Sequence, residues 1–214
     1  MIKHMLAHLF ARVVTVFARL VTGVRPDWRG CLPEPRQRVY FANHASHGHF
    51  VLIWTVLPPP LRHITRPVAG ADYWAKGAIR RFIGEQVFRA VLIDRVAIER
   101  TRDPLAVMGE SLTAGDSLII FPEGTRNTTE APLLPFRAGL YHLARTWPKV
   151  EFVPVWIDNI SRVMPKGELL PIPLLCSVTF GTPLALRTDE SKDDFLARAR
   201  GAMLALAPGQ RREP

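Results

Sequence analysis

Three clusters of polar side chains in this 214-residue chain carry groups that can do chemistry. They are the histidine-rich run Asn43–His49, the pair Asp94-Arg95, and the run Glu123–Asn127. A neutral histidine is the usual proton acceptor near pH 7, and the planar fork of arginine binds phosphate oxygens in a bidentate way. The residue types therefore indicate proton transfer close to a bound anion.

Each cluster comes directly after an expected strand, over residues 39–41, 86–93 and 117–121. Further strands are expected over 151–157 and 177–180, and residues 25–38 are expected to form a connector. Helices are expected over 50–57, 71–82, 103–114, 137–146 and from a cap at Asp189 to about 205. The alternation predicts one α/β domain whose mostly parallel or mixed sheet is flanked by helices. Ligands bind beyond the carboxyl ends of such strands, so the clusters predict one composite site.

The clusters also resemble the motifs of the glycerolipid acyltransferase family, and in particular the bacterial 1-acyl-sn-glycerol-3-phosphate acyltransferases. The motifs are Asn43-His44 with Ser46, the run VLIDR over 91–95, the run FPEGTRN over 121–127, and the run VPV over 153–155. They occur in the family's order and approximate spacing, over roughly residues 39 to 185. The FPEGTRN block is highly specific, whereas VLIDR and VPV support the resemblance only in combination.

The resemblance implies transfer of a fatty acyl group from an acyl thioester, either acyl-CoA or acyl-carrier protein, to the hydroxyl of lysophosphatidate or a related lysophospholipid. The product would be phosphatidate, and no metal or prosthetic group would be needed. His44 matches the family's catalytic histidine and would take the proton of the acceptor hydroxyl. Because that hydroxyl attacks the thioester directly, no serine or cysteine nucleophile is required.

The resemblance also assigns the residues that would bind the acceptor. Arg95 and Arg126 match the phosphate-binding arginines, and Arg137 is a weaker candidate of the same kind. Glu123 would bond the glycerol hydroxyls, or alternatively form a structural ion pair with Arg126. Gly124 would let the backbone approach the ligand closely. The predicted substrate-binding set is Arg95, Glu123, Gly124, Thr125, Arg126 and Arg137.

One position departs from the family. The family motif is a histidine, four residues and an aspartate, but here the last position is His49. An aspartate would orient the imidazole of His44 and stabilise its charged form, whereas a neutral His49 carries no charge and a protonated one would depress the basicity of His44. Either activity is reduced, or another acid substitutes, or the sequence is altered here. We still assign His49 to the catalytic pair.

Two other functions compete with acyl transfer. His44, His47 and His49 form a cluster that could bind zinc in a hydrolase, although the Asp-His that continues the metallohydrolase signature is absent from the sequence. A formal net charge of +9, with 23 of 28 basic residues being arginine, would also suit nucleic acid. No nucleic-acid-binding motif supports that class, and a GC-rich genome would give the same arginine excess. Cys31 and Cys176 suggest neither a disulfide nor a metal site.

The N-terminal segment is expected to form an amphipathic helix over residues 1–23 that lies in a membrane interface. Its polar residues form one thin stripe at helical spacing: His4, His8, Arg12, Thr15, Arg19 and Thr22. Arg12 and Arg19 argue against a spanning helix, and a helix covering the core is the alternative. We expect an acyltransferase domain over 24–207, a tail over 208–214, and attachment to an anionic surface, namely the cytoplasmic face of a bacterial inner membrane.

Overall fold

A seven-stranded sheet runs through the middle of the molecule. The computed structural model describes residues 2–44, 48–74, 76–94, 102–158 and 175–208. The strand order is β1-β7-β6-β2-β5-β3-β4. The five strands from β6 to β4 are mutually parallel, while β7 pairs antiparallel with β6 and parallel with β1. The strands are β1 (Arg25–Trp28), β2 (Arg38–Ala42), β3 (Thr65–Gly70), β4 (Val91–Ile93), β5 (Ser117–Ile120), β6 (Glu151–Asp158) and β7 (Ser177–Phe180).

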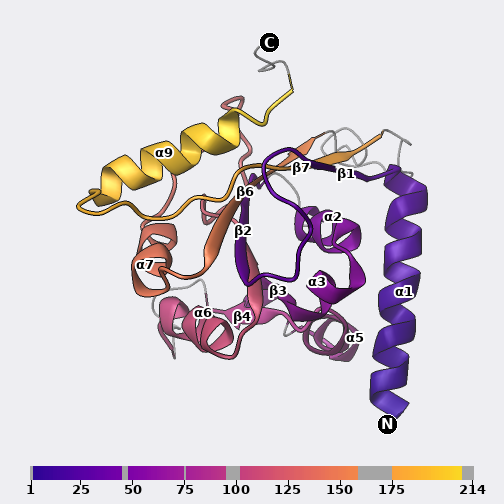
Figure 1. Cartoon of the computed structure of the whole chain (residues 1–214). Coiled ribbons are helices and arrows are strands. Elements are labelled where there is room, and N and C mark those ends of the chain that lie inside the picture. Colours follow the sequence, from indigo (N-terminus) through magenta and orange to yellow (C-terminus); the bar gives the residue numbers. More distant parts are fainter. Residues whose placement is uncertain (1, 45–47, 75, 95–101, 159–174, 209–214) are drawn as a thin grey trace.

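Helices cover both faces of the sheet (Figure 1). The helices α1, α2 and α3 lie on one side, and α6, α7 and α9 lie on the other. The helices are α1 (Ile2–Thr22), α2 (His49–Val56), α3 (Pro59–Ile64), α4 (Ala71–Trp74), α5 (Ala78–Phe82), the π-helical turn η1 (Ile83–Val87), α6 (Pro104–Thr113), α7 (Gly139–Thr146) and α9 (Lys192–Leu204). The predicted α/β class with a mostly parallel sheet is confirmed.

The central strand β2 is apolar at consecutive positions because both of its faces are buried. Val39 and Phe41 pack into the core on the side of α6, α7 and α9, while Tyr40 and Ala42 pack into the core on the side of α2. All four side chains are fully buried. Parallel strands covered by helices on both faces give continuous apolar runs of this kind.

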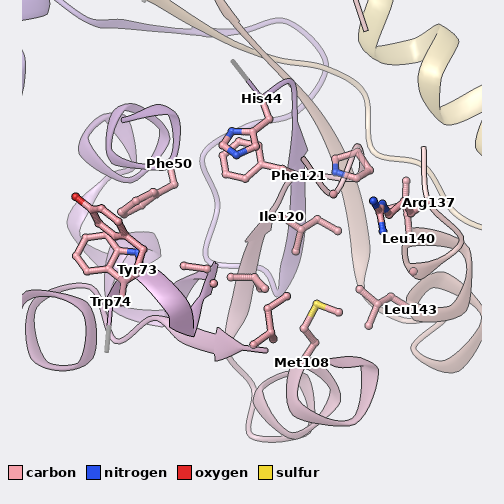
Figure 2. Close-up of a pocket in the computed structure, with 17 residues that line it drawn as sticks. His44, Phe50, Tyr73, Trp74, Met108, Ile120, Phe121, Arg137, Leu140 and Leu143 are labelled. Atoms are coloured by element: carbon pink, nitrogen blue, oxygen red, sulfur yellow. The ribbon is translucent and has the colours of Figure 1, made fainter. Parts of the chain in front are cut away.

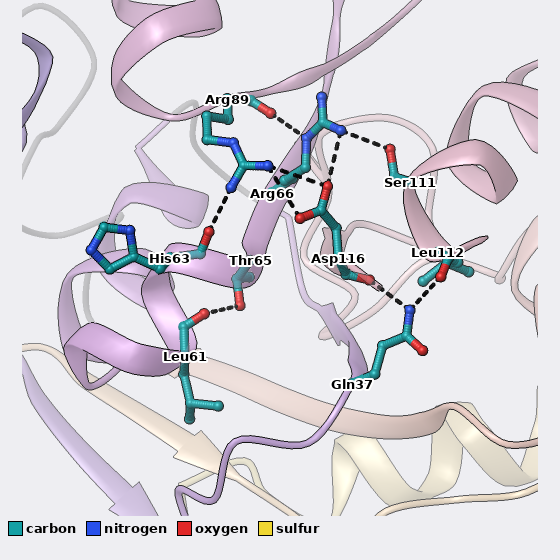
Figure 3. A network of polar contacts seen from close by, with 9 residues as sticks. All are labelled: Gln37, Leu61, His63, Thr65, Arg66, Arg89, Ser111, Leu112 and Asp116. Atoms are coloured by element: carbon teal, nitrogen blue, oxygen red, sulfur yellow. Dashed lines mark hydrogen bonds and ion pairs between the residues drawn. The ribbon is translucent and has the colours of Figure 1, made fainter. Parts of the chain in front are cut away.

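The amino ends of the central strands are held by a polar network around Asp116, the residue before β5 (Figure 3). Its carboxylate pairs with Arg66 at 3.1 Å and with Arg89 at 3.2 Å. The side-chain amide of Gln37, which precedes β2, donates to the carbonyls of Leu112 and Asp116. The network leaves the opposite, carboxyl ends of the strands for the polar clusters.

Several expected elements are wrong in detail. The helix expected over 71–82 is two short helices, α4 and α5, and Gly77 with a φ of +86° precedes the second. The strand expected over 86–93 is only β4, because η1 and the left-handed Arg89 occupy the positions before it. The expected connector contains β1, and no strand is predicted from the sequence where β3 lies, a strand that has Pro67 inside it.

Helix caps explain one confirmed and one wrong helix start. The Asp103 side chain accepts a hydrogen bond from the Leu105 amide and begins α6 as expected. The last helix begins at Ser191, whose hydroxyl accepts from the Asp194 amide, and not at the expected Asp189. Asp189 has a φ of +57°, so its backbone turns the chain before the helix begins.

The long helix α1 has its apolar face on the outside. Only part of its polar stripe faces the domain: Thr15 and Thr22 are buried and donate to carbonyls one turn earlier, whereas His8, Arg12 and Arg19 are exposed. Its large apolar side chains point outward, with Leu9, Phe17 and Leu20 being 58%, 65% and 78% exposed. A helix that only covered a core would present the opposite face. Residues Met5–Thr22 are long and apolar enough to cross a membrane by length and composition alone.

Candidate active site

The peptide of His44 is held on both sides by the loop that follows β5. β2 and β5 are neighbours in the sheet, so the segments after them meet at its carboxyl edge. The His44 amide donates to Glu123 Oε1 at 2.8 Å, and the Asn127 amide donates to the His44 carbonyl at 2.6 Å. Two clusters that lie far apart in the sequence are therefore joined at the residue that matches the family's base.

The side chain of His44 is positioned by an aromatic ring. Its imidazole stacks on Phe121 with 4.1 Å between ring centroids and 19° between ring planes. The ring borders a cavity of about 190 Å³ in the part of the chain that the structure describes. Stacking on a fixed ring restricts the imidazole to one plane beside that cavity.

Glu123 holds two loops together. It is 2% exposed, and its second carboxylate oxygen accepts from the Leu134 amide at 2.9 Å. Burial raises the pKa of the Glu123 carboxyl, and the backbone hydrogen bonds from Leu134 and His44 oppose that rise. The predicted contact of Glu123 with glycerol hydroxyls stays a prediction, and the bonds in the structure are to backbone N–H groups. The alternative ion pair with Arg126 is not formed.

His49 is the first residue of α2 and is 1% exposed. Its Nδ1 lies 2.9 Å from the carbonyl oxygen of Asn43, and its ring centroid lies 6.0 Å from that of His44. Burial lowers its pKa to about 4, and the hydrogen bond to Asn43 only partly offsets this. A carbonyl accepts only, so Nδ1 carries the hydrogen and Nε2 carries the lone pair. His49 is thus a neutral ring with a defined tautomer near pH 7.

Arg137 enters the site through the space that Gly124 leaves. A Cβ at Gly124 would lie 2.3 Å from Arg137 Nε, and the φ of Gly124 is +69°. The Arg137 backbone amide donates to the Pro122 carbonyl at 2.8 Å, which ties the start of the next segment to the loop. In this structure, therefore, the absence of a side chain at Gly124 makes room for the side chain of Arg137. Arg137 borders the same cavity as His44.

The other predicted site residues are not gathered in this way. Thr125 and Arg126 lie in the same loop with exposed side chains, and Arg126 forms no ion pair with any described residue. Arg95, which was expected to bind phosphate, lies outside the described residues, as do Ser46 and His47. No group of three potential metal ligands occurs among the residues that the structure describes.

The cavity beside His44 is mostly apolar (Figure 2). His44 and Phe121 lie near one end, and Met108 lies toward the other. Phe50, Tyr73 and Trp74 form one side, while Arg137, Leu140 and Leu143 form the opposite side. An imidazole at one end of an apolar pocket with one arginine suits a substrate that has a polar end and a hydrocarbon chain.

A comparison with protein families decides the class of the protein. The family model described as Acyltransferase matches residues 30–158, which include β2, β5, β6 and the loops that hold His44. The chain belongs to the Acyltransferase family. The family stated as a resemblance from the motifs is confirmed.

Two proteins that are similar to this acyltransferase-family chain are named for the same activity. The 1-acyl-sn-glycerol-3-phosphate acyltransferase of Limnanthes alba is 26% identical over 84% of this chain and 61% of its own length. The protein of that name from Saccharomyces cerevisiae is 30% identical over 60% of this chain and 41% of its own length. The chain therefore spans less than two thirds of these relatives.

A solved structure shares the fold of this acyltransferase-family chain. The 1-acyl-sn-glycerophosphate acyltransferase of Thermotoga maritima superposes with a TM-score of 0.71 and 19% sequence identity. The match covers 97% of this chain and 83% of that chain. The α/β arrangement described above is thus shared over almost the whole chain.

Three residues of the candidate site were not assigned roles from the sequence. The Asn43 side chain exchanges two hydrogen bonds with the backbone of Ile157, so it ties the end of β2 to β6. Phe121 supplies the stacking ring, and Asn127 supplies the amide that binds the His44 carbonyl. All three lie inside the recognised motifs, and an amide side chain directly after a buried strand is a signal for such a tie.

Proposed function

We propose that this protein transfers a fatty acyl group from an acyl thioester, acyl-CoA or acyl-carrier protein, to the free hydroxyl of lysophosphatidate or a related lysophospholipid, giving phosphatidate. The observation that carries the proposal is the position of His44, whose backbone is held at both its N–H and its C=O beside an apolar cavity. The names of the relatives from Limnanthes and yeast support the same reaction.

The chemistry requires one proton acceptor. His44 takes the proton of the acceptor hydroxyl as its oxygen attacks the thioester carbonyl and forms a tetrahedral intermediate. Collapse breaks the carbon–sulfur bond, and the imidazolium returns the proton to the leaving thiolate. The products are the ester and a free thiol, and His44 is neutral again. This sequence of steps uses no covalent enzyme intermediate, metal or prosthetic group.

His49 orients the base without contributing charge. Its Nδ1–H donates to the Asn43 carbonyl, so the lone pair of the ring is on Nε2. The ring is buried next to that of His44. A protonated His49 would repel the imidazolium of His44, but burial keeps His49 neutral at physiological pH. The family's aspartate would add a negative charge at this position, so this chain works without the charge stabilisation of the imidazolium.

The acceptor phosphate is bound by arginines at the rim of the cavity. Arg137 lines the same cavity as His44, and Arg126 extends from the loop that holds the His44 peptide. Charge-assisted bonds from a guanidinium to phosphate are among the stronger polar contacts. Arg95 belongs to the same proposed set by its match to the family motif. The acyl chain then occupies the apolar part of the cavity between Phe50 and Leu143.

The protein binds a membrane through α1, at the cytoplasmic face of a bacterial inner membrane. The exposed apolar face of the helix is the support for this contact. The helix packs against α2 and η1, and its buried side begins at Ala7 and continues to Thr22. A helix attached to the domain over this length lies in the interface plane more readily than it crosses the bilayer, and Arg12 and Arg19 favour the same position.

The deciding experiment measures acyl transfer by the purified full chain. Wild type and His44→Ala are incubated with an acyl thioester and a panel of lysophospholipids, with and without a metal chelator. We expect ester formation with lysophosphatidate, no effect of chelator, and loss of the activity in His44→Ala. Thioester or ester hydrolysis that requires metal, in place of transfer, would overturn the proposal and favour the histidine-cluster hydrolase.

A further inference from the structure

A second cavity, of about 660 Å³, lies between α1, α3 and η1. It shares no lining residue with the cavity beside His44. Among the described residues, its lining contains no aspartate or glutamate, and its basic residues come from three segments: His8, Arg12, Arg62, His63 and Arg89. Five basic side chains around one hollow without a carboxylate in its lining is the composition of an anion site.

Two of the arginines are held in place by the fold. Arg62 donates to the carbonyls of Trp54, Thr55 and Leu57 at the end of α2. Arg89 donates to the His63 carbonyl, and its guanidinium also pairs with Asp116 (Figure 3). Cations that are already fixed lose little conformational entropy when an anion binds between them.

The positive charge around the cavity exceeds the negative charge available to it. Asp116 is shared between Arg66 and Arg89, and neither Arg12 nor Arg62 forms an ion pair within the described part of the chain. Burial, and then the charge of Arg19, lowers the pKa of Arg62. The end of α2 explains why Arg62 is there, since helix carbonyls attract a cation. It does not explain Arg12 and His8, which α1 brings to the same cavity.

The two cavities are separated by aromatic rings. Phe88 lies with its ring centroid 5.0 Å from that of Phe50, which lines the cavity beside His44, and 5.1 Å from that of Trp54, which lines the basic cavity. Both contacts are edge-to-face. An anion in the basic cavity therefore does not reach His44, and the site is distinct from that of the reacting acceptor.

We propose that the basic cavity binds the phosphate group of an anionic phospholipid of the bilayer. The inference rests on the proposed membrane contact of α1, because the helix that lines the cavity also carries the outward apolar face. An interfacial helix lies with its apolar side about 5–10 Å into the boundary between headgroups and acyl chains. The flank of α1 that carries His8 and Arg12 is then level with the lipid phosphates. The cavity makes membrane binding selective for anionic lipid.

The test uses the full chain and vesicles of phosphatidylcholine, alone or mixed with phosphatidylglycerol. The cavity variant Arg12→Gln/His63→Gln is compared with Arg145→Gln/His142→Gln, which removes the same residue types from α7 on the other side of the sheet. We expect the cavity variant to lose about fivefold or more in affinity for the mixed vesicles only, since one basic residue near an anionic surface contributes on the order of 1 kcal/mol. The α7 variant should change by less than about twofold. Equal losses in both variants would overturn the proposal.

A second measurement distinguishes the lipid from a free anion. Short-chain phosphatidylglycerol below its micelle concentration and inorganic phosphate are each titrated into wild type and into Arg12→Gln, whose substituted side chain is exposed and should not affect folding. Tighter binding of the lipid, weakened by the substitution, supports the proposal. Equal binding of phosphate and lipid overturns it. If vesicle binding fails altogether while the short-chain lipid still binds, the membrane contact is wrong and the phosphate site stands.

Discussion

His49 places a buried neutral ring where the family motif has a carboxylate, so its protonation state determines the charge that faces His44. Its Nδ1 bonds a backbone carbonyl, and the ring lies beside that of His44. The sequence left open whether His49 would be charged and would oppose the base. Because burial lowers its pKa to about 4, the neutral form is the one that faces His44 at physiological pH.

The first prediction concerns stability as the pH falls. The His49 pKa is about 4 in the folded chain, against an ordinary value of 6.5. Between these values the unfolded chain binds a proton that the folded chain does not, so stability is lost as the pH falls from 6.5 toward 4 and is unaffected above 6.5. At pH 5 the loss is about 2 kcal/mol.

The measurement is urea unfolding of wild type and His49→Gln at pH 7 and at pH 5. Glutamine keeps a polar side chain but does not titrate, so wild type should lose about 2 kcal/mol more than the variant between the two pH values. Parallel losses in both proteins would show that His49 titrates normally and is not buried as described.

The second prediction concerns the missing charge. His49→Asp should raise acyl transfer, because a carboxylate stabilises the imidazolium that forms on His44 during the reaction. The gain is bounded by about 10⁴, the effect of replacing the corresponding aspartate by asparagine in serine proteases. It should be largest near neutral pH, and His44→Ala in the same background should abolish it. Flat or lower activity in His49→Asp would remove this acid–base pair from the mechanism.

The third prediction separates the two described arginines from the acyl donor. Arg126→Ala and Arg137→Ala should each lower kcat/KM for the lysophospholipid, because each removes a charged hydrogen bond worth about 1.5–3 kcal/mol. Arg145→Ala, an exposed arginine on α7, is the control. Kinetics with varied acceptor and varied thioester provide the check. A change confined to the apparent affinity for the thioester would mean that these arginines bind the donor.

At the scale of elements, α1 has two faces with different partners. Its small and polar residues, such as Ala18 and Thr22, pack on the domain, and its large apolar residues point away from it. Removing residues 1–23 would uncover the protein surface that α1 covers as well as remove the outward apolar face that is proposed to bind the membrane. Point changes on the outer face therefore test membrane binding more cleanly than deletion does.

The fourth prediction uses such changes. Phe17→Glu/Leu20→Glu should weaken vesicle binding by at least tenfold, since each side chain contributes about 1.5–3 kcal/mol when it is buried in an apolar phase. The thermal midpoint should not change, because both side chains are mostly exposed in the domain. Vesicle flotation is the measurement, with Leu32→Glu as the control, an equally exposed leucine in the loop after β1. Unchanged flotation of the α1 variant would place the membrane contact elsewhere.

At the scale of the whole molecule, the cavity beside His44 is formed by residues of several elements that meet only in the fold. One end includes Met108 of α6, and the two opposite sides include Phe50 of α2 and Leu143 of α7 (Figure 2). Its depth is set by the packing of these helices against the sheet. Under the proposed function, the length of the acyl chain that the cavity accepts therefore depends on how these helices pack.

The fifth prediction tests that property. Met108→Ala should extend the cavity and shift donor preference toward longer acyl chains, at a stability cost of about 2–5 kcal/mol. Met203→Ala is the matched control, because Met203 is fully buried on α9 and lines neither cavity. Competition between thioesters of different length is the measurement. An equal shift in both variants would show that lost stability, and not cavity depth, changes the preference.

Local sequence patterns were sufficient to predict many of the elements and the polar clusters of the site. The cap at Asp103, the strands of the central sheet and the polar clusters after them depend on neighbouring residues, so short-range rules find them. The family motifs placed His44 and the 121–127 loop in one site before the fold was known. The misplaced elements are the ones where tertiary pairing overrides propensity, such as β3 with Pro67 between two other strands.

What the sequence determined by itself is the set of chemical groups and their order along the chain: a histidine predicted to be the base, arginines predicted to bind phosphate, and an α/β alternation to carry them. Only the tertiary structure decided which way each group faces. It turned Glu123 to two backbone amides, buried His49 as a neutral ring, and buried Thr15 and Thr22 of α1 against the domain. The physical reason is that protonation, burial and hydrogen-bond partners depend on residues brought close by packing, and a linear pattern contains no information on those distances.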